Sequence, residues 1–206
     1  MRSYINLIFS VLILNFISLT AKAEMTLNYL IFDDATPYNL KILEAIPAEG
    51  KIQFGVNNAK HTIIEFFDYF CGYCKKMHPE LINLAKSRGD LRVIFLQHPI
   101  LNESSKVLAK IAIAANMQNK GFAIHDSLFS IQGSITSEKL QESILEAGLN
   151  EVKLKVDMER DEVNNIIKLS SFLASGSGAR GTPSIFVNDE FYGGYLPSEK
   201  IEGLLN

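Results

Sequence analysis

The feature that most constrains this chain is a pair of cysteines, Cys71 and Cys74, which stand three positions apart and are the only two among its 206 residues. A chain of this length can bury a hydrophobic core and needs no disulfide to hold it together. Residues 62–67 form a β-branched and aromatic run typical of a strand buried on both faces. After the cysteines, apolar positions recur at helical spacing until Gly89. The pair is therefore expected where a strand ends and a helix begins, which is where open α/β sheets place active sites.

A sulfur at the start of a helix faces unpaired backbone N–H groups and the positive end of the helix dipole, which favour the thiolate. Cys71 is thus expected to be the reactive sulfur, and Cys74, one turn further along, to be the shielded, resolving thiol. A structural disulfide across so short a loop would stabilise the fold by only about 2 kcal/mol. A closed zinc site needs four ligands, and only His78 stands at suitable spacing. We interpret the pair as a redox-active disulfide and expect neither a metal nor a cofactor.

The rest of the chain predicts an α/β fold interrupted by helices. Residues 91–96 read as the next buried strand, 103–175 as helices, and 184–187 as a return to sheet. The expected organisation is an α/β domain over 52–206 with a helical insertion at about 100–175.

Glu65 is the second unusual residue, because it interrupts an apolar strand six positions before Cys71. A buried carboxylate costs several kcal/mol unless it is neutral or hydrogen-bonded, so burial should raise its pKa. It would then suit proton exchange with Cys74 through water. The alternative places Glu65 on the exposed face of an edge strand, and the sequence does not choose between them. Asp68 is expected to be a capping or loop residue rather than a catalyst.

Composition and the histidines give weaker signals. A net charge of −3 without a basic run argues against nucleic acid as a partner. His78 is expected at the surface, and His125, beside Asp126, as a satisfied structural residue rather than a ligand.

The first 23 residues have the parts of a secretory signal peptide: a basic residue, an apolar run at 5–19 and a small-x-small site at 21–23. An uncleaved membrane anchor is the alternative, because the run approaches the shortest length that spans a bilayer. We favour cleavage and export. Residues 24–51 follow as a candidate oligomerisation segment, in which 47–50 resemble a linker.

At these residues the chain resembles the DsbA-like family of bacterial periplasmic thiol oxidoreductases, and more specifically the branch with the suppressor-of-copper-sensitivity and DsbA-like outer-membrane antigen proteins. The resemblance runs from about Val56 to the C-terminus and implies a thioredoxin fold with an inserted helical domain. Its anchors are residues 64–74, 98–101, 125–129 and 180–188.

The resemblance also implies roles for site residues. Cys71 would be the attacking sulfur, Cys74 the resolving one and Glu65 the buried carboxylate. Taken alone, the Thr182–Pro183 bond is expected to be trans, since only about 5–6 % of such bonds are cis. The resemblance implies instead that it is cis and that Thr182 binds substrate by pairing with an extended peptide.

One departure concerns the residues between the cysteines. Family oxidases often carry Pro-His there, whereas this chain has Gly72 and Tyr73 and no positive charge. Gly-Tyr, together with Thr182 before the proline, is also the pattern of the disulfide isomerase DsbC. Isomerases of that kind are usually oligomers with an N-terminal assembly segment, and residues 24–51 could serve here in a homodimer.

The sequence therefore predicts a periplasmic thiol–disulfide interchange protein that oxidises or isomerises disulfides in exported proteins. Its partners would be unfolded or misfolded exported proteins and a membrane redox partner that reoxidises or reduces the dithiol. The alternative from another class is a periplasmic copper-binding or chaperone protein that uses the two thiols as a soft-metal site.

Overall fold

The computed structural model describes residues 36–206, of which Tyr38–Asn206 carry the sheet and the helices. The predicted signal peptide, residues 1–23, lies outside the described residues, as do residues 24–35 of the segment expected to take part in oligomerisation. Among the described helices, none is long and apolar enough to cross a membrane.

Five strands form one mixed sheet in the order β1-β3-β2-β4-β5. The two central strands, β2 and β3, run parallel, and every other neighbouring pair is antiparallel. The strands are β1 (Ile52–Gly55), β2 (His61–Phe67), β3 (Leu91–Gln97), β4 (Ser184–Val187) and β5 (Glu190–Gly193).

The two faces of the sheet follow the alternation of side chains along its strands. On β2, Ile63 and Phe67 pack into one buried cluster, whereas Ile64 and Phe66 pack into another. Successive strand residues point to opposite faces, so Glu65 shares a face with Ile63 and Phe67. The predicted strand buried on both faces is confirmed, because β2 lies between β3 and β4.

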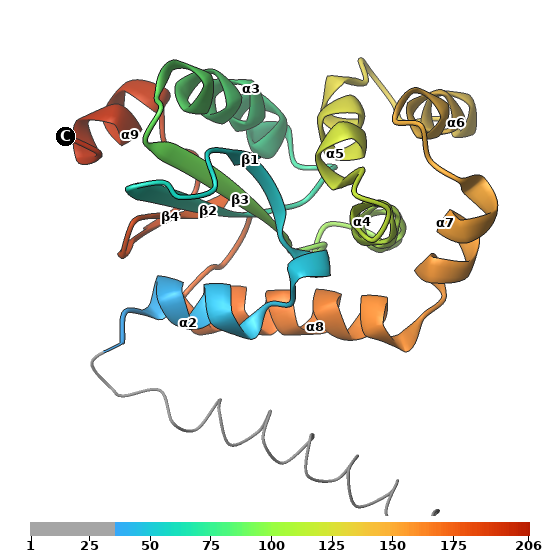
Figure 1. Ribbon diagram of the computed structural model, residues 1–206, viewed down its shortest axis with the longest axis horizontal. Coiled ribbons are helices and arrows are strands. Elements are labelled where there is room, and N and C mark those ends of the chain that lie inside the picture. Colours follow the sequence, from blue (N-terminus) through green and yellow to red (C-terminus); the bar gives the residue numbers. More distant parts are fainter. Residues whose placement is uncertain (1–35) are drawn as a thin grey trace, which may run out of the picture. The chain divides into compact units, whose positions relative to one another are not determined.

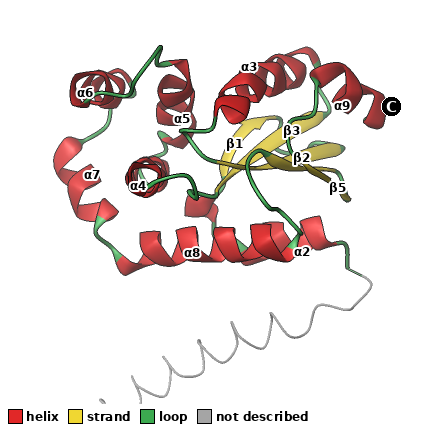
Figure 2. Cartoon of the chain, turned by 180° about the vertical axis from the view of Figure 1, so that it is seen from behind, coloured by secondary structure: helices red, strands yellow, loops and turns green. Residues whose placement is uncertain are grey.

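Helices cover both faces (Figure 1, Figure 2). On the face that Glu65 shares lie α3 (Gly72–Ser87) and α9 (Ser198–Leu204), and on the other lie α2 (Tyr38–Ala45) and α8 (Asp161–Gly176). Between β3 and β4 the chain is helical, and the predicted α/β class is confirmed. The helices before α8 in this stretch are α4 (Glu103–Asn116), α5 (Gly121–Ser130), α6 (Ser137–Glu146) and α7 (Glu151–Met158).

The described part of the segment before β1 packs onto the sheet. Ile42 of α2 is fully buried in the cluster that includes Phe186. Residues 47–50 do not form a linker, and that expectation is wrong: Ala48–Gly50 form a 3₁₀ turn, η1. A side-chain carbon added at Gly50 would lie 2.6 Å from the Ile166 side chain, so the turn needs glycine for close packing.

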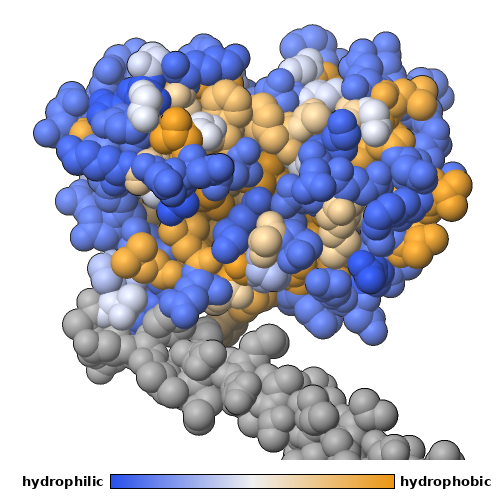
Figure 3. All heavy atoms as spheres, in the orientation of Figure 1, coloured by the Kyte–Doolittle hydropathy of each residue, from blue (hydrophilic) through white to orange (hydrophobic). Residues whose placement is uncertain are grey.

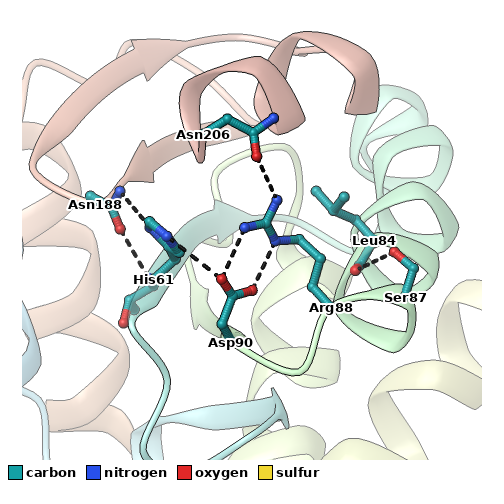
Figure 4. A network of polar contacts seen from close by, with 8 residues as sticks. His61, Leu84, Ser87, Arg88, Asp90, Asn188 and Asn206 are labelled. Carbon is teal, nitrogen blue, oxygen red and sulfur yellow. Dashed lines mark hydrogen bonds and ion pairs between the residues drawn. The ribbon is translucent and has the colours of Figure 1, made fainter.

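A polar network joins the amino ends of β2 and β3 to the β4–β5 turn and the C-terminus (Figure 4). The Asn188 side chain lies 3.2 Å from Nδ1 of His61, and Nε2 of His61 lies 3.8 Å from Asp90. Arg88 donates two hydrogen bonds to Asp90, at 2.9 and 3.0 Å, and a third to Asn206 at 3.3 Å. The network holds together four segments that are distant in sequence.

The surface is mixed in character. Hydrophilic side chains cover most of the face shown in Figure 3, and hydrophobic side chains reach the surface in patches between them. Large exposed apolar residues include Val152 and Val156 on α7 and Tyr73 at the start of α3. Of these, Tyr73 lies beside the cysteines, and its surroundings are described below.

Candidate active site

The site is built where β2 ends and α3 begins. Cys71 is the N-cap of α3, and its sulfur accepts a hydrogen bond from the backbone N–H of Cys74 at 3.5 Å. The Cys71 backbone N–H donates to the Asp68 carbonyl at 3.0 Å, which fixes the turn that leads into the helix. Cys71 retains 8 % of its surface, whereas Cys74 has none, and no disulfide joins the two. The predicted placement at a strand end and helix start is confirmed.

The surroundings of Cys71 favour its thiolate. A hydrogen bond with the Cys74 thiol is the largest cause, and contacts with Thr182 and with the backbone N–H groups of Tyr73 and Cys74 add to it. Together they outweigh the opposing effect of burial and lower the pKa of Cys71 from 9.0 to about 5. Cys71 is therefore a thiolate at neutral pH without a positive side chain between the cysteines.

Cys74 behaves in the opposite way. Burial is the largest cause that raises its pKa, followed by its hydrogen bond with Cys71 and the charge of Glu65. The inner sulfur therefore holds its proton while the outer one gives it up. Two cysteines one helical turn apart are thus made chemically unequal, Cys71 by the hydrogen bonds to its sulfur and Cys74 mainly by its burial.

Glu65 is fully buried on the α3 side of the sheet. Neither carboxyl oxygen has a nitrogen or oxygen hydrogen-bond partner among the described residues. Its pKa is raised well above the usual range, first by burial and then by the charge of Cys71, and a hydrogen bond with the Cys74 thiol opposes this. The alternative of an exposed edge strand is wrong, because β2 is central in the sheet.

Thr182, the residue before Pro183, lies beside the Cys71 sulfur. The Cys71 sulfur is 3.1 Å from the Thr182 carbonyl oxygen, although 111 positions separate the two residues. The bond between Thr182 and Pro183 is cis. The expectation of a trans bond is wrong. It rested on the average frequency of cis X-Pro bonds, which contains no information about the fold around this particular bond. The Thr182 hydroxyl is buried and has no nitrogen or oxygen hydrogen-bond partner among residues 36–206.

Asp68 supports the loops around the site. The sequence predicted this role only in part. It is a loop residue, as expected, but its buried carboxylate accepts four hydrogen bonds. The backbone N–H groups of Phe70, Ile100 and Leu101 and the Ser105 hydroxyl donate them, at 2.8 to 3.0 Å. Asp68 therefore ties the loop before Cys71 to the loop after β3 and to the start of α4.

A buried cluster of rings lies beneath the site. His78 is 3 % exposed, and its Nε2 lies 2.9 Å from Asp126, so the surface expectation for it is wrong. It lies one turn after Cys74 on the face of α3 that meets α5. His125 is fully buried and shares a 3.0 Å hydrogen bond with the Tyr69 hydroxyl. Burial is the main cause that lowers the pKa of both histidines. Among the described residues, no group of three or more acidic, histidine or cysteine side chains could hold a metal ion.

Tyr73, between the cysteines, packs on the opposite flank. Its ring centroid lies 6.0 Å from that of Tyr195, in the loop after β5. The Lys76 ammonium sits 4.2 Å above the Tyr195 ring, and the Tyr195 hydroxyl donates to Glu80 at 2.6 Å. Tyr73 is thus an exposed ring that contacts a second tyrosine on this side of the site.

Known proteins share the fold of this chain. The family model described as Thioredoxin matches residues 48–206. A solved thioredoxin-like oxidoreductase from Silicibacter pomeroyi DSS-3 is 29 % identical, has a TM-score of 0.73, and is matched over 84 % of this chain and 95 % of that one. The catalytic domain of Proteus mirabilis ScsC is 21 % identical, with a TM-score of 0.69 over 77 % of this chain and 88 % of that one, a likeness of fold.

Curated relatives fall into two kinds. The disulfide bond formation protein D of Bacillus subtilis (strain 168) is 21 % identical over 166 residues, which are 75 % of each protein. The Na(+)/H(+) antiporter NhaA of Herminiimonas arsenicoxydans is 24 % identical over 151 residues, which are 73 % of this chain. The chain spans about a quarter of that antiporter's length. The predicted thioredoxin fold with a helical insertion is confirmed, and so is the resemblance to DsbA-like and ScsC proteins.

Proposed function

This chain belongs to the thioredoxin family, and we propose that it is a periplasmic thiol–disulfide interchange protein that oxidises or isomerises disulfides in exported proteins. The observation that carries the proposal is the inequality of the two sulfurs. Cys71, at the amino end of α3, has its pKa lowered to about 5, and Cys74 lies protonated beneath it. A thiolate that still reaches the surface, beside a fully buried thiol, is the arrangement that thiol–disulfide exchange requires.

In the oxidising direction, a substrate thiolate attacks the Cys71 sulfur of the Cys71–Cys74 disulfide. The bond between the two sulfurs breaks, and its electron pair goes to Cys74, which takes up a proton. A second substrate thiolate then attacks the substrate sulfur of the mixed disulfide and expels Cys71 as a thiolate. Two electrons pass from substrate to protein, and the low pKa of Cys71 makes it a good leaving group.

In the isomerising direction, the reduced Cys71 thiolate attacks a wrong substrate disulfide and releases one substrate thiolate. That thiolate, or another in the same polypeptide, then attacks the mixed disulfide, forms a new pairing and expels Cys71. No net electrons move. Cys74 resolves a mixed disulfide that fails to rearrange.

Two residues support these steps. We assign Glu65 the exchange of the Cys74 proton, because it is the buried carboxyl group that interacts with both sulfurs. We assign Thr182 the binding of the substrate backbone, because its carbonyl oxygen lies beside the reacting sulfur. An extended peptide could pair there as an added strand.

The cellular setting rests on the signal peptide expected at residues 1–23 and on the family resemblance. Unfolded or misfolded exported proteins would be the substrates, and a membrane redox partner would reset the dithiol. A homodimer formed through residues 24–51 is part of the same proposal. Light scattering of the chain from residue 24 and from residue 36 tests it without removing α2 from the sheet; a monomeric mass for both would contradict the dimer.

The central experiment follows the refolding of reduced and of scrambled ribonuclease. The wild-type protein should accelerate one or both, and Cys71→Ser should lose this acceleration by about a thousandfold or more. The matched variant Cys74→Ser keeps the nucleophile, so it should accumulate a mixed disulfide that Cys71→Ser does not form. Equal activity of Cys71→Ser and wild type would overturn the proposal.

The direction is set by the redox potential of the pair. Equilibration of the dithiol in glutathione buffers measures it. A value near roughly −120 mV would place the protein with strong oxidants, whereas one near roughly −180 mV or below would favour isomerisation or reduction.

A further inference from the structure

A hollow of about 260 Å³ opens beside Cys71, on the flank away from Tyr73. Its walls come from the turn before α3, the end of α5 and the loop between α5 and α6. Five side chains with aromatic or aliphatic groups line it: Tyr69, Phe70, Leu128, Ile131 and Ile135. Cys71 is itself part of the lining, so the hollow adjoins the reacting residue.

Lys75 is the one charged residue in this lining. It stands one helical turn after Cys71, and its ammonium group donates a short hydrogen bond to the Ile131 carbonyl. An ammonium has three donors, and the other two have no protein acceptor within residues 36–206. No carboxylate in that part of the chain lies within ion-pair distance of Lys75. A half-buried cation without a carboxylate partner therefore lies in the same hollow as Cys71, among largely apolar walls.

The outer wall of the hollow is held in place. Lys139 donates to the carbonyls of Gln132 at 2.6 Å and Ser134 at 3.3 Å, and Lys75 holds Ile131 from the other side. Two lysines thus bind three carbonyls of the loop that joins α5 to α6. Such a wall can select a ligand, because its groups are positioned before the ligand arrives.

We propose that this hollow is a subsite for the polypeptide linked to Cys71, and that it takes an apolar side chain together with a carboxylate that pairs with Lys75. The favoured substrates are therefore exported polypeptides that carry an apolar and an acidic residue within two positions of the reacting cysteine. The inference rests on the proposed function, since the polypeptide is presented by its mixed disulfide with Cys71.

The size of the hollow favours this occupant. Pockets for small molecules span roughly 300–1,000 Å³, so this one is small for a free organic ligand. It suits one or two side chains of a chain already anchored at the sulfur. Its single cation supplies a preference in charge that the apolar walls alone do not.

The test uses the reduced full chain and a series of peptide disulfides. Each peptide has one leucine beside its cysteine and a single Glu, Gln or Lys, placed in turn at each remaining position from two before to two after that cysteine. At one position, Glu should react about fivefold faster than Gln, the size of a partly exposed ion pair, and Lys more slowly than Gln. Lys75→Gln should remove the preference, and Lys75→Glu should reverse it.

Lys76→Gln is the matched control, because it removes the same charge from the next residue, which contacts Tyr195 and does not line the hollow. It should keep the preference for Glu. Equal loss of the preference in both variants would mean that the field of the helix acts without a subsite. Absence of any preference in the wild type would overturn the proposal as well.

The uncharged hydroxyethyl disulfide separates this inference from the proposed function. It carries no side chain for the hollow, so its rate with wild type and with Lys75→Gln is the reference to which the peptide rates of each protein are compared. Reaction with it but indifference to peptide charge would refute the subsite alone. Failure to react with it at all would refute the thiol–disulfide function.

Discussion

The two ends of β2 treat their polar groups in opposite ways. At the amino end, His61, Asp90, Arg88 and Asn188 each take part in at least one hydrogen bond (Figure 4). The buried Nε2 of His61 has no hydrogen-bond partner among the described residues, but it lies 3.8 Å from the Asp90 carboxylate. Around the carboxyl end, the oxygens of Glu65 and the hydroxyl of Thr182 are buried without nitrogen or oxygen partners in the described residues.

This contrast separates stability from chemistry within one strand. A paired polar group at the amino end stabilises the fold modestly, and its loss leaves a partner unsatisfied. An unpaired buried group at the carboxyl end costs stability but stays free to exchange a proton or meet a substrate. Substitutions at the two ends should therefore move stability and reactivity in different combinations.

Asp68 gives the largest expected effect on stability, because it is the paired exception at the carboxyl end. Asp68→Ala removes the acceptor of four hydrogen bonds, one buried and three partly buried, and leaves the backbone donors of Phe70, Ile100 and Leu101 without it. Unfolding free energy should fall by about 3 kcal/mol or more. Guanidinium unfolding of the reduced protein measures it.

The control for Asp68 is the exposed carboxylate of Asp189 in the β4–β5 turn. Asp189→Ala should change stability by about 0.5 kcal/mol or less. A similar small effect of Asp68→Ala would break the comparison, because the best-paired group at the active end would then contribute nothing.

Glu65→Gln should raise stability at neutral pH by about 2 kcal/mol, since it replaces a buried acid that has no nitrogen or oxygen partner in the described residues with a neutral group of similar shape. Because the folded pKa of Glu65 is raised, its protonation favours the folded state fully below the unfolded pKa of 4.5 and loses this effect as pH rises through the folded pKa. The gain should therefore appear above about pH 4.5 and vanish below it.

Urea unfolding of the reduced wild type and Glu65→Gln at pH 7 and pH 4 checks this sign. The same variant should release mixed disulfides more slowly if Glu65 exchanges the Cys74 proton. Lower stability at pH 7 would show that Glu65 is paired, and the contrast between the ends of β2 would fail.

These differences mark what local sequence can predict. The run from Ile63 to Phe67 and the spacing of Cys71 and Cys74 predicted the central strand, the helix start and the unequal sulfurs, because each depends on neighbouring residues. The burial of His78 depends on α5, and its partner Asp126 is 48 positions away. The prediction that His78 lies at the surface came from its position along α3 and contained no information about the packing against α5.

Long-range partners also explain what was missed at the site. Ser105 reaches Asp68 from 37 positions away, so a loop position was predictable but the four bonds were not. The hollow beside Cys71 exists only where α3, α5 and the following loop meet. Chemistry carried by a contiguous motif is readable from sequence, whereas the shape of the surface around it is not.

The acidity of Cys71 tests the contrast between the two ends of β2 through a reaction rate rather than through the stability of the fold. With a pKa of about 5, alkylation of the reduced protein by iodoacetamide should be nearly constant from pH 8 to 6 and fall about tenfold between pH 7 and 4. Because this pKa is depressed, its stabilisation of the folded state is complete above the reference value of 9.0 and is lost as pH falls through about 5.

Cys74→Ser isolates the Cys71 rate from any reaction of the inner sulfur. It also weakens the largest cause of the shift, so its inflection should move upward from that of the wild type. An inflection of the wild type near pH 8 or 9 would contradict an activated thiolate and would leave the carboxyl end of β2 chemically ordinary.

Asn188→Gly should give the smallest effect and one confined to stability. Asn188 has a positive φ of 56°, which glycine adopts without strain, so the variant loses only the side-chain contacts to His61 and to the Thr62 backbone N–H. Stability should fall by about 1 kcal/mol, with the alkylation rate of Cys71 unchanged.

Asn119→Gly is the matched control: Asn119 is exposed, has a φ of 58°, and its change should be close to neutral. A slower or faster Cys71 in Asn188→Gly would mean that the paired end of β2 tunes the reactive end, and the two could no longer be treated as independent.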